Sequence, residues 1–293
     1  MWSLTALIGV IAISNAQLGD SANKKPLKVA AMQKVCHLSL EMTKVPAYVA
    51  NRLQQLGREA AELQELQKIL LTAVLPTDGA VDEELSTLVL LTDKLAVETA
   101  QKMQNGAERA VLTAGRCAFY AGRVHEFVSV FFQSMVTGSK YCIKGASNEA
   151  KTSELACISD DKGNPPALLT TGGSDEPDVA AKYAALKAGA AELAADGSEA
   201  DCGLTMHDST DGGYINGQNI VQAVNWGGEL FTTSTGSAPT QTNWQTNTAP
   251  TADASTYQEC SKHLAWIVDQ LKSAEQAEKL LLLLDSEHST WQD

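Results

Sequence analysis

The sequence predicts a mainly α-helical protein: a long antiparallel two-helix coiled-coil hairpin with a third C-terminal helix and an irregular, disulfide-bonded lobe. Three observations predict this fold. Apolar residues recur at intervals of seven through the first helical segment, and a second segment of similar length follows a short turn. Four of the six cysteines lie beyond residue 138, where the helical pattern ends.

The first helix is expected from about Lys25 to Ala73. One apolar position repeats at strict intervals of seven, which is typical of a coiled-coil seam rather than of a short globular helix. Pro46 lacks a backbone N–H donor, so it is expected to kink the helix or to mark its first full turn. The predicted seam, for the coiled coil and for a dimer, consists of Val35, Met42, Val49, Leu56, Leu63 and Leu70.

A turn at Pro76-Thr77-Asp78-Gly79 precedes a second helix, expected over about Val81–Val136. Helices of this length span roughly 70–80 Å, and a connection of four residues requires them to pack antiparallel. Gly106, Gly115 and Gly122 weaken helix propensity but permit close approach of another backbone. A rod this thin leaves apolar surface on its other sides, so a partner chain or a later segment is expected to cover it.

The remaining sequence is less regular. Residues 138–174 are expected to form a disulfide-bonded loop, and residues 180–195 an Ala-rich helix. Short strands are expected near Ile220–Val224 and Leu230–Thr233. In Thr232–Thr256, 12 of 25 residues are Ser or Thr, which predicts an exposed loop. A last helix, from about Tyr257 to Leu284, is expected to join the bundle.

Composition and the N-terminus indicate an exported protein. The 293 residues include 22 Lys and Arg against 35 Asp and Glu, a formal charge of −13, which argues against nucleic acid or an anionic membrane surface as the main partner. Residues 1–16 are predicted to be a signal peptide, with an apolar core from Leu4 to Ile13 and a cut before Gln17. The domain is then expected over residues 17–293. No stretch of 18 apolar residues predicts a membrane-spanning helix.

Six cysteines in an exported chain predict disulfide bonds. They are Cys36, Cys117, Cys142, Cys157, Cys202 and Cys260. Spacing leaves all fifteen pairings open, and the absence of a CxxC pair argues against a metal site. The sequence contains no Asn-x-Ser/Thr acceptor for N-linked glycan.

Catalytic motifs are absent from the sequence, so we expect no enzyme, no cofactor and no metal. His37 and His125 fall on the long helices, where an exposed or core-edge imidazole is expected. His207 with Asp208 and Asp211 is more typical of a polar turn than of a metal or base cluster.

Several short segments form an ordered set along the chain. They are Lys34-Val35-Cys36-His37-Leu38-Ser39, Lys44-Val45-Pro46-Ala47-Tyr48, Ala121–Phe131, Ser139-Lys140-Tyr141-Cys142, Glu154-Leu155-Ala156-Cys157, Cys202-Gly203-Leu204-Thr205 and Asp211-Gly212-Gly213. In these residues and in their order, the sequence resembles the N-terminal domain of class A trypanosome variant surface glycoproteins. At His125 an acidic residue is more usual in that family.

The resemblance implies a surface coat glycoprotein that forms a dense protective layer and mediates antigenic variation and evasion of host immunity. It implies a homodimer, recognition by host antibodies, and disulfides Cys36–Cys157 and Cys142–Cys202, with Cys117 and Cys260 as an additional pair. It also implies attachment to the outer face of the plasma membrane through a GPI anchor. The family's C-terminal domain and anchor signal are not recognised before Asp293, so a secreted product is expected if the chain ends there. The alternative is a nutrient (transferrin-like) receptor subunit on the same scaffold.

Overall fold

The structure, a computed structural model, describes residues 25–74, 83–167, 173–188, 202–205, 222–228, 230–234, 240–241 and 256–272. The predicted signal peptide, the Pro76–Gly79 turn and the His207 region lie outside these residues. The predicted fold class is confirmed: two long helices form a hairpin, further helices pack against it, and three disulfide bonds connect the parts.

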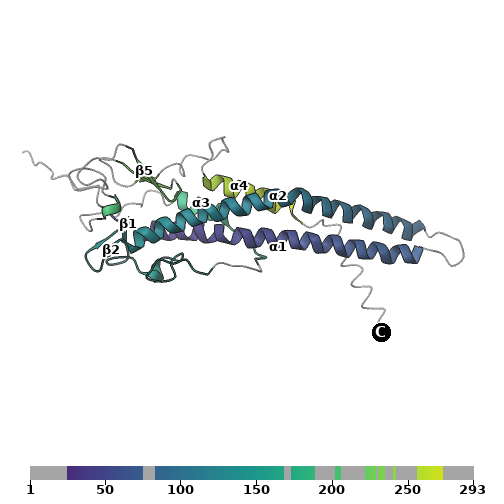
Figure 1. Ribbon diagram of the computed structural model, residues 1–293, viewed down its shortest axis with the longest axis horizontal. Helices are drawn as coiled ribbons and strands as arrows, with labels where there is room; N and C mark the ends of the chain where they lie inside the picture. Colours follow the sequence, from purple (N-terminus) through teal and green to yellow (C-terminus); the bar gives the residue numbers. More distant parts are fainter. Residues whose placement is uncertain are drawn as a thin grey trace, which may run out of the picture.

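The hairpin consists of α1 (Val29–Val74) and α2 (Glu83–Gln133), which lie antiparallel along their whole length (Figure 1). Ser39 Oγ donates a hydrogen bond to the Ala121 carbonyl (3.1 Å) near one end, and Gln67 Nε2 donates to Asp93 Oδ1 (2.9 Å) near the other. These two contacts define the register of the pair. Five of the six predicted seam residues are buried, and Leu70 is half-buried.

Pro46 lies well inside α1, which begins at Val29, so the expectation that Pro46 marks the first turn is wrong. Proline removes one helical hydrogen bond. On both sides of it, however, α1 buries apolar side chains against the rest of the molecule, including Val45, Tyr48 and Val49. This burial favours a continuous helix over a break.

Short strands gather at the end of the hairpin where α1 begins and α2 ends; we call this end the head. Here β1 (Leu27–Lys28) pairs in parallel with β4 (Ile143–Lys144). The next pair, β2 (Met135–Val136) and β3 (Lys140–Tyr141), forms a hairpin whose turn contains Gly138 at φ +74°. A three-stranded antiparallel sheet is formed by β5 (Val224–Trp226), β6 (Phe231–Thr233) and β7 (Thr240–Gln241).

The strand near Leu230–Thr233 is found as β6, and the one expected near Ile220–Val224 begins only at Val224. Within the predicted exposed loop, Thr232 and Thr233 are buried. Their strand, β6, begins at buried Phe231 and pairs with β5 on one edge and β7 on the other, which a Ser/Thr count does not reveal. Most of the rest of that loop lies outside the described residues.

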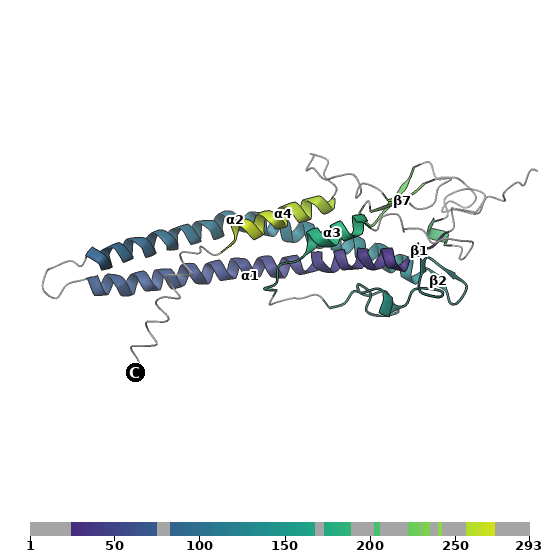
Figure 2. The same ribbon diagram turned by 180° about the vertical axis from the view of Figure 1, so that it is seen from behind.

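Two further helices cover the head half of the hairpin (Figure 2). The first, α3 (Val179–Ala188), packs on α1, and the second, α4 (Thr256–Gln270), packs on α2. Near the start of α4, Cys260 is bonded to Cys117, whereas Leu271, just past its end, lies against Gly106. Therefore α4 runs antiparallel to α2. The predicted continuation to Leu284 lies outside the described residues. Two single turns of 3-10 helix, η2 (Thr152–Glu154) and η4 (Gly203–Thr205), lie in the head loops.

Candidate functional site

Three disulfide bonds connect the later segments of the chain to the hairpin and to one another. They join Cys36 to Cys157, Cys117 to Cys260 and Cys142 to Cys202, with Cα–Cα distances of 4.9, 4.9 and 4.7 Å. All six cysteines are buried. These pairs are the same as those that the resemblance implies. The first bond ties residues 145–164, which we call the head loop, to α1, and the second ties α4 to α2.

The head loop is also ordered by its own carboxylates. Glu154 accepts hydrogen bonds from the backbone N–H groups of Ala146 (3.0 Å) and Lys151 (2.8 Å). Asp160 accepts from the side chain of Asn164 (2.7 Å) and from the backbone N–H groups of Asn164 and Lys162 (both 3.0 Å), and these bonds hold the pKa of Asp160 below its usual value. Because both carboxylates satisfy backbone donors, the loop keeps a defined shape on the surface.

His125 lies on α2 beneath this loop. Its Nε2 is buried and has no hydrogen-bond partner among the described residues. Burial lowers the pKa of His125, while the charge of Glu126 and the backbone of Cys157 and Gly163 act in the opposite direction. His37, by contrast, is exposed on α1. The two helix histidines therefore differ in environment: His37 is an exposed imidazole and His125 lies at the edge of the core.

An aromatic cluster attaches the three-stranded sheet to α2. The ring of Phe127 lies 4.7 Å from that of Phe131 and 5.1 Å from that of Phe231, and Trp226 lies 5.1 Å from Phe131 between centroids. At Gly227 the backbone has φ +60°, and a Cβ there would lie 3.1 Å from the Phe127 ring. A glycine is therefore required where the turn after β5 passes over α2.

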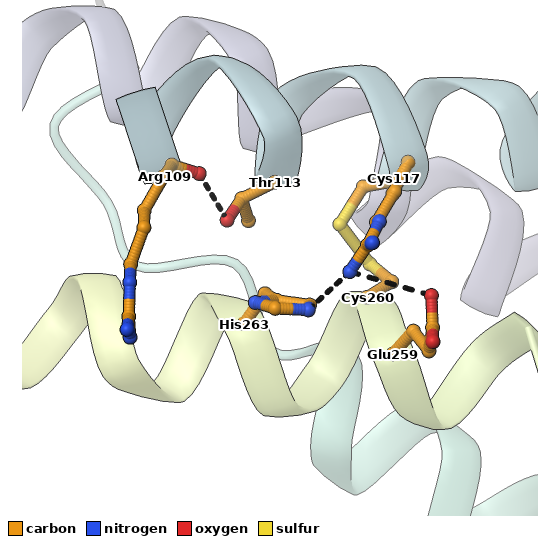
Figure 3. The surroundings of a disulfide bond; sticks show 7 residues. Arg109, Thr113, Cys117, Glu259, Cys260 and His263 are labelled. Carbon is orange, nitrogen blue, oxygen red and sulfur yellow. Dashed lines mark hydrogen bonds and ion pairs between the residues drawn. A yellow bond between two sulfur atoms is a disulfide. The ribbon is translucent and has the colours of Figure 1, made fainter. Parts of the chain in front are cut away.

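The contact between α4 and α2 surrounds the second disulfide (Figure 3). Arg116 of α2 forms a hydrogen bond with His263 Nε2 and an ion pair with Glu259 Oε2 at 3.4 Å. About two helical turns before Arg116, the guanidinium of Arg109 lies 4.3 Å from the centroid of the Trp266 ring. Burial, followed by the charge of Arg116, lowers the pKa of His263. Polar contacts thus flank a covalent bond at one helix–helix contact.

The outward side of α2 carries an exposed apolar face. We define the α2 face as Val111, Leu112, Gly115, Ala118, Phe119 and Gly122, which fall on one side of the helix. The exposed fractions are 71% for Val111 and 59% for Phe119. A Cβ at Gly115 or Gly122 would meet no atom within 4 Å. A shallow groove of about 510 Å³ adjoins the face. It is lined in part by Phe119 of the face and by Arg123, Phe127 and Trp226.

The described residues contain no group of three or more His, Cys, Asp or Glu side chains placed to hold a metal ion. Nor does any helix in the described part combine the length and apolar character needed to cross a membrane.

Sequence reasoning missed the polar contact between α2 and α4. The available signal is a set of arginines at seven-residue spacing, Arg109, Arg116 and Arg123, which places them along one line of α2. The partners of Arg109 and Arg116 lie about 150 positions later in the chain, so the spacing shows where a contact could form but not with which residues.

Comparison with known proteins gives three consistent results. The family model for the trypanosome variant surface glycoprotein (A-type) matches residues 7–286. Variant surface glycoprotein MITAT 1.5 of Trypanosoma brucei brucei is 27% identical over 230 residues, which are 74% of this chain and 48% of the relative, so the chain spans about half of that protein's length. The solved structure of MITat 1.1 superposes with a TM-score of 0.58 at 16% identity, covering 86% of this chain and 71% of that one, which supports the fold. The match over nearly the whole chain shows that it belongs to the A-type trypanosome variant surface glycoprotein family.

Proposed function

We propose that this chain is a surface coat protein of a trypanosome that forms a dense protective layer and takes part in antigenic variation and evasion of host immunity. The observation that carries the proposal is the family match over residues 7–286. The shape is consistent with it, because a long, narrow hairpin can pack side by side with its copies. No catalytic role is assigned.

Antigenic variation requires a part of the surface that can change at little cost in stability. The head offers such surface: the loop residues Ser147, Asn148, Asp161 and Lys162 are exposed, while the cysteines and Leu155 beneath them are buried. Substitutions at exposed polar positions change stability by less than about 0.5 kcal/mol in most proteins. The buried framework can therefore stay constant while the exposed residues vary.

The receptor alternative is not favoured, because the family match and the relative are both variant surface glycoproteins. Attachment to the outer face of the plasma membrane through a GPI anchor, and removal of residues 1–16 as a signal peptide, belong to the same proposal. Release of the cell-bound protein by phospholipase C and N-terminal sequencing at Gln17 are the corresponding measurements.

We propose that the head faces outward and that the far end of the hairpin, where α1 ends and α2 begins, faces the membrane. It is tested on live trypanosomes that express this chain as their coat protein. Antibodies raised against residues 145–164 should bind these cells, and antibodies raised against residues 57–74 should bind only after the cells are permeabilised or the protein is released. Equal binding of both antibodies to live cells would contradict a dense, oriented coat.

A homodimer is the partner that we propose, with the α2 face as its contact. Exposed Val111 and Phe119 give an apolar surface, and Gly115 and Gly122 leave room for another backbone. Five of the six seam residues are buried inside one chain, and Leu70 is half-buried, which favours the α2 face over the seam as the dimer contact.

Analytical ultracentrifugation tests the dimer. The unsubstituted protein should sediment as a dimer, and Phe119→Asp should shift it to a monomer with an unchanged helical circular dichroism spectrum. Leu71→Asp is the matched control, because Leu71 is also exposed but lies on α1 near the far end. Loss of the dimer with the control variant but not with Phe119→Asp would place the contact elsewhere.

A further inference from the structure

The contact between α4 and α2 combines a covalent bond with a titratable group. Arg116 of α2 contacts both His263 and Glu259 of α4. In Figure 3, these two residues of α4 lie close to the bond between Cys117 and Cys260. Cys260 lies between Glu259 and His263 in the sequence. The covalent bond and the polar contacts therefore act on the same turn of α4.

The hydrogen bond requires a particular protonation state of His263. A guanidinium group is always charged and can only donate, so the Nε2 atom that faces Arg116 must accept with its lone pair. His263 is therefore neutral in this contact, with its proton on Nδ1. Protonation of Nε2 would remove the acceptor and would place an imidazolium against a guanidinium.

The surrounding charges make the protonated state of His263 unfavourable. Arg109, which packs on Trp266, and Lys262 on α4 add positive charge around His263. Glu259 opposes them, but it is also the ion-pair partner of Arg116. The carboxylates of Glu176 and Asp178 line a separate groove with Ser261, Leu264 and Val268, away from the Arg116 contact. Burial further disfavours the charged ring.

We propose that the Arg116–His263–Glu259 cluster is an acid-sensitive contact that loosens α4 from α2 when His263 takes up a proton. The Cys117–Cys260 bond is unaffected by acid and keeps α4 attached. Acid would thus increase local opening of α4, in which Leu264, Ile267 and neighbouring Leu271 leave the core, without unfolding the hairpin. The inference concerns a contact within one chain and does not rest on the proposed coat function.

Hydrogen exchange measured by mass spectrometry tests the proposal. Peptides from residues 256–272 are compared at about pH 7.5 and about pH 5.5, with correction for the intrinsic exchange rate. The opening equilibrium of α4 should rise in acid, by up to about tenfold for each unit by which the folded pKa of His263 lies below its unfolded value. Residues 92–100 of α2, which lie beyond the contact between Gly106 and Leu271, serve as the internal reference.

Two variants of His263 separate this contact from other effects of acid. His263→Gln keeps a side-chain acceptor for Arg116 but cannot take up a proton, so its α4 peptides should exchange equally at both pH values. His263→Lys carries a permanent charge and should show fast α4 exchange already at about pH 7.5. An acid response in His263→Gln equal to that of the unsubstituted protein, or no response in the unsubstituted protein, would overturn the proposal.

Discussion

The two halves of the hairpin are built differently. In the outer half, residues 57–74 of α1 and 83–103 of α2, the described residues show two helices held by a single seam. Leu63 is fully buried there, but Leu90 and Ile69 are 71% and 58% exposed. In the head half, α3, α4, short strands and three disulfides surround the same two helices. A periodic seam is therefore sufficient to pair two helices, whereas an irregular lobe requires cross-links.

The largest effect is expected from a substitution in the buried seam of the outer half. Leu63→Asp places a carboxylate at a fully buried position and should lower the free energy of unfolding by about 4–5 kcal/mol. Chemical denaturation followed by circular dichroism measures it. The matched control is Leu90→Asp, at an exposed position of the same half, which should change stability by less than about 0.5 kcal/mol. Equal losses in the two variants would show that this half has no buried seam.

The next effect concerns the head half. Phe131→Ala removes a fully buried ring that contacts Phe127 and Trp226, and should lower the free energy of unfolding by about 3–4 kcal/mol. The control Val136→Ala, whose side chain is 61% exposed in the same head, should lower it by less than about 0.5 kcal/mol. If denaturation gave the same midpoint for both variants, the aromatic cluster would not hold the sheet to α2.

A smaller effect distinguishes glycines on the two sides of α2. Gly122→Ala meets no neighbouring atom and should raise stability by about 1 kcal/mol through helix propensity. At Gly106 a Cβ would lie 2.4 Å from Leu271 Cδ2, so Gly106→Ala should give no such gain. Thermal unfolding is measured in the Phe119→Asp background, because Gly122 lies in the proposed dimer contact. The same gain at both sites would mean that Leu271 does not pack on α2.

The smallest effect is a pH dependence from His125. Its pKa is lowered in the folded protein, so the unfolded chain binds more protons in acid, and stability falls as the pH drops below the ordinary value of 6.5. The ring is only half-buried, which limits the effect. His125→Gln should reduce the loss of stability between about pH 7.5 and about pH 5.5, measured by thermal unfolding. His37→Gln, at an exposed position, should leave the loss unchanged, and an equal response of the two variants would contradict the buried environment of His125.

Local patterns were enough to predict the elements that repeat. Seven-residue spacing located α1 and its seam, and a stripe at spacings of three and four located α2, because each pattern needs only neighbouring turns of one helix. The same reasoning erred where neighbours in space decide the outcome. Pro46 lies inside α1 between buried side chains and not at its first turn, and Thr232 and Thr233 are buried in the central strand of a three-stranded sheet.

The sequence alone determined that this protein is an acidic chain that forms a long helical hairpin with a cysteine-containing lobe, because periodicity, turn residues and charge are properties of the chain itself. Spacing left fifteen disulfide pairings open, and it could not show that Arg116 meets His263 or that Phe127 meets Phe231. Only the tertiary structure decided these contacts, since it joins residues 121, 143 and 60 positions apart through disulfides and 147 positions apart through the Arg116 hydrogen bond. Such distant partners leave no periodic trace, because either residue could have paired with any suitable group that folding brought near it.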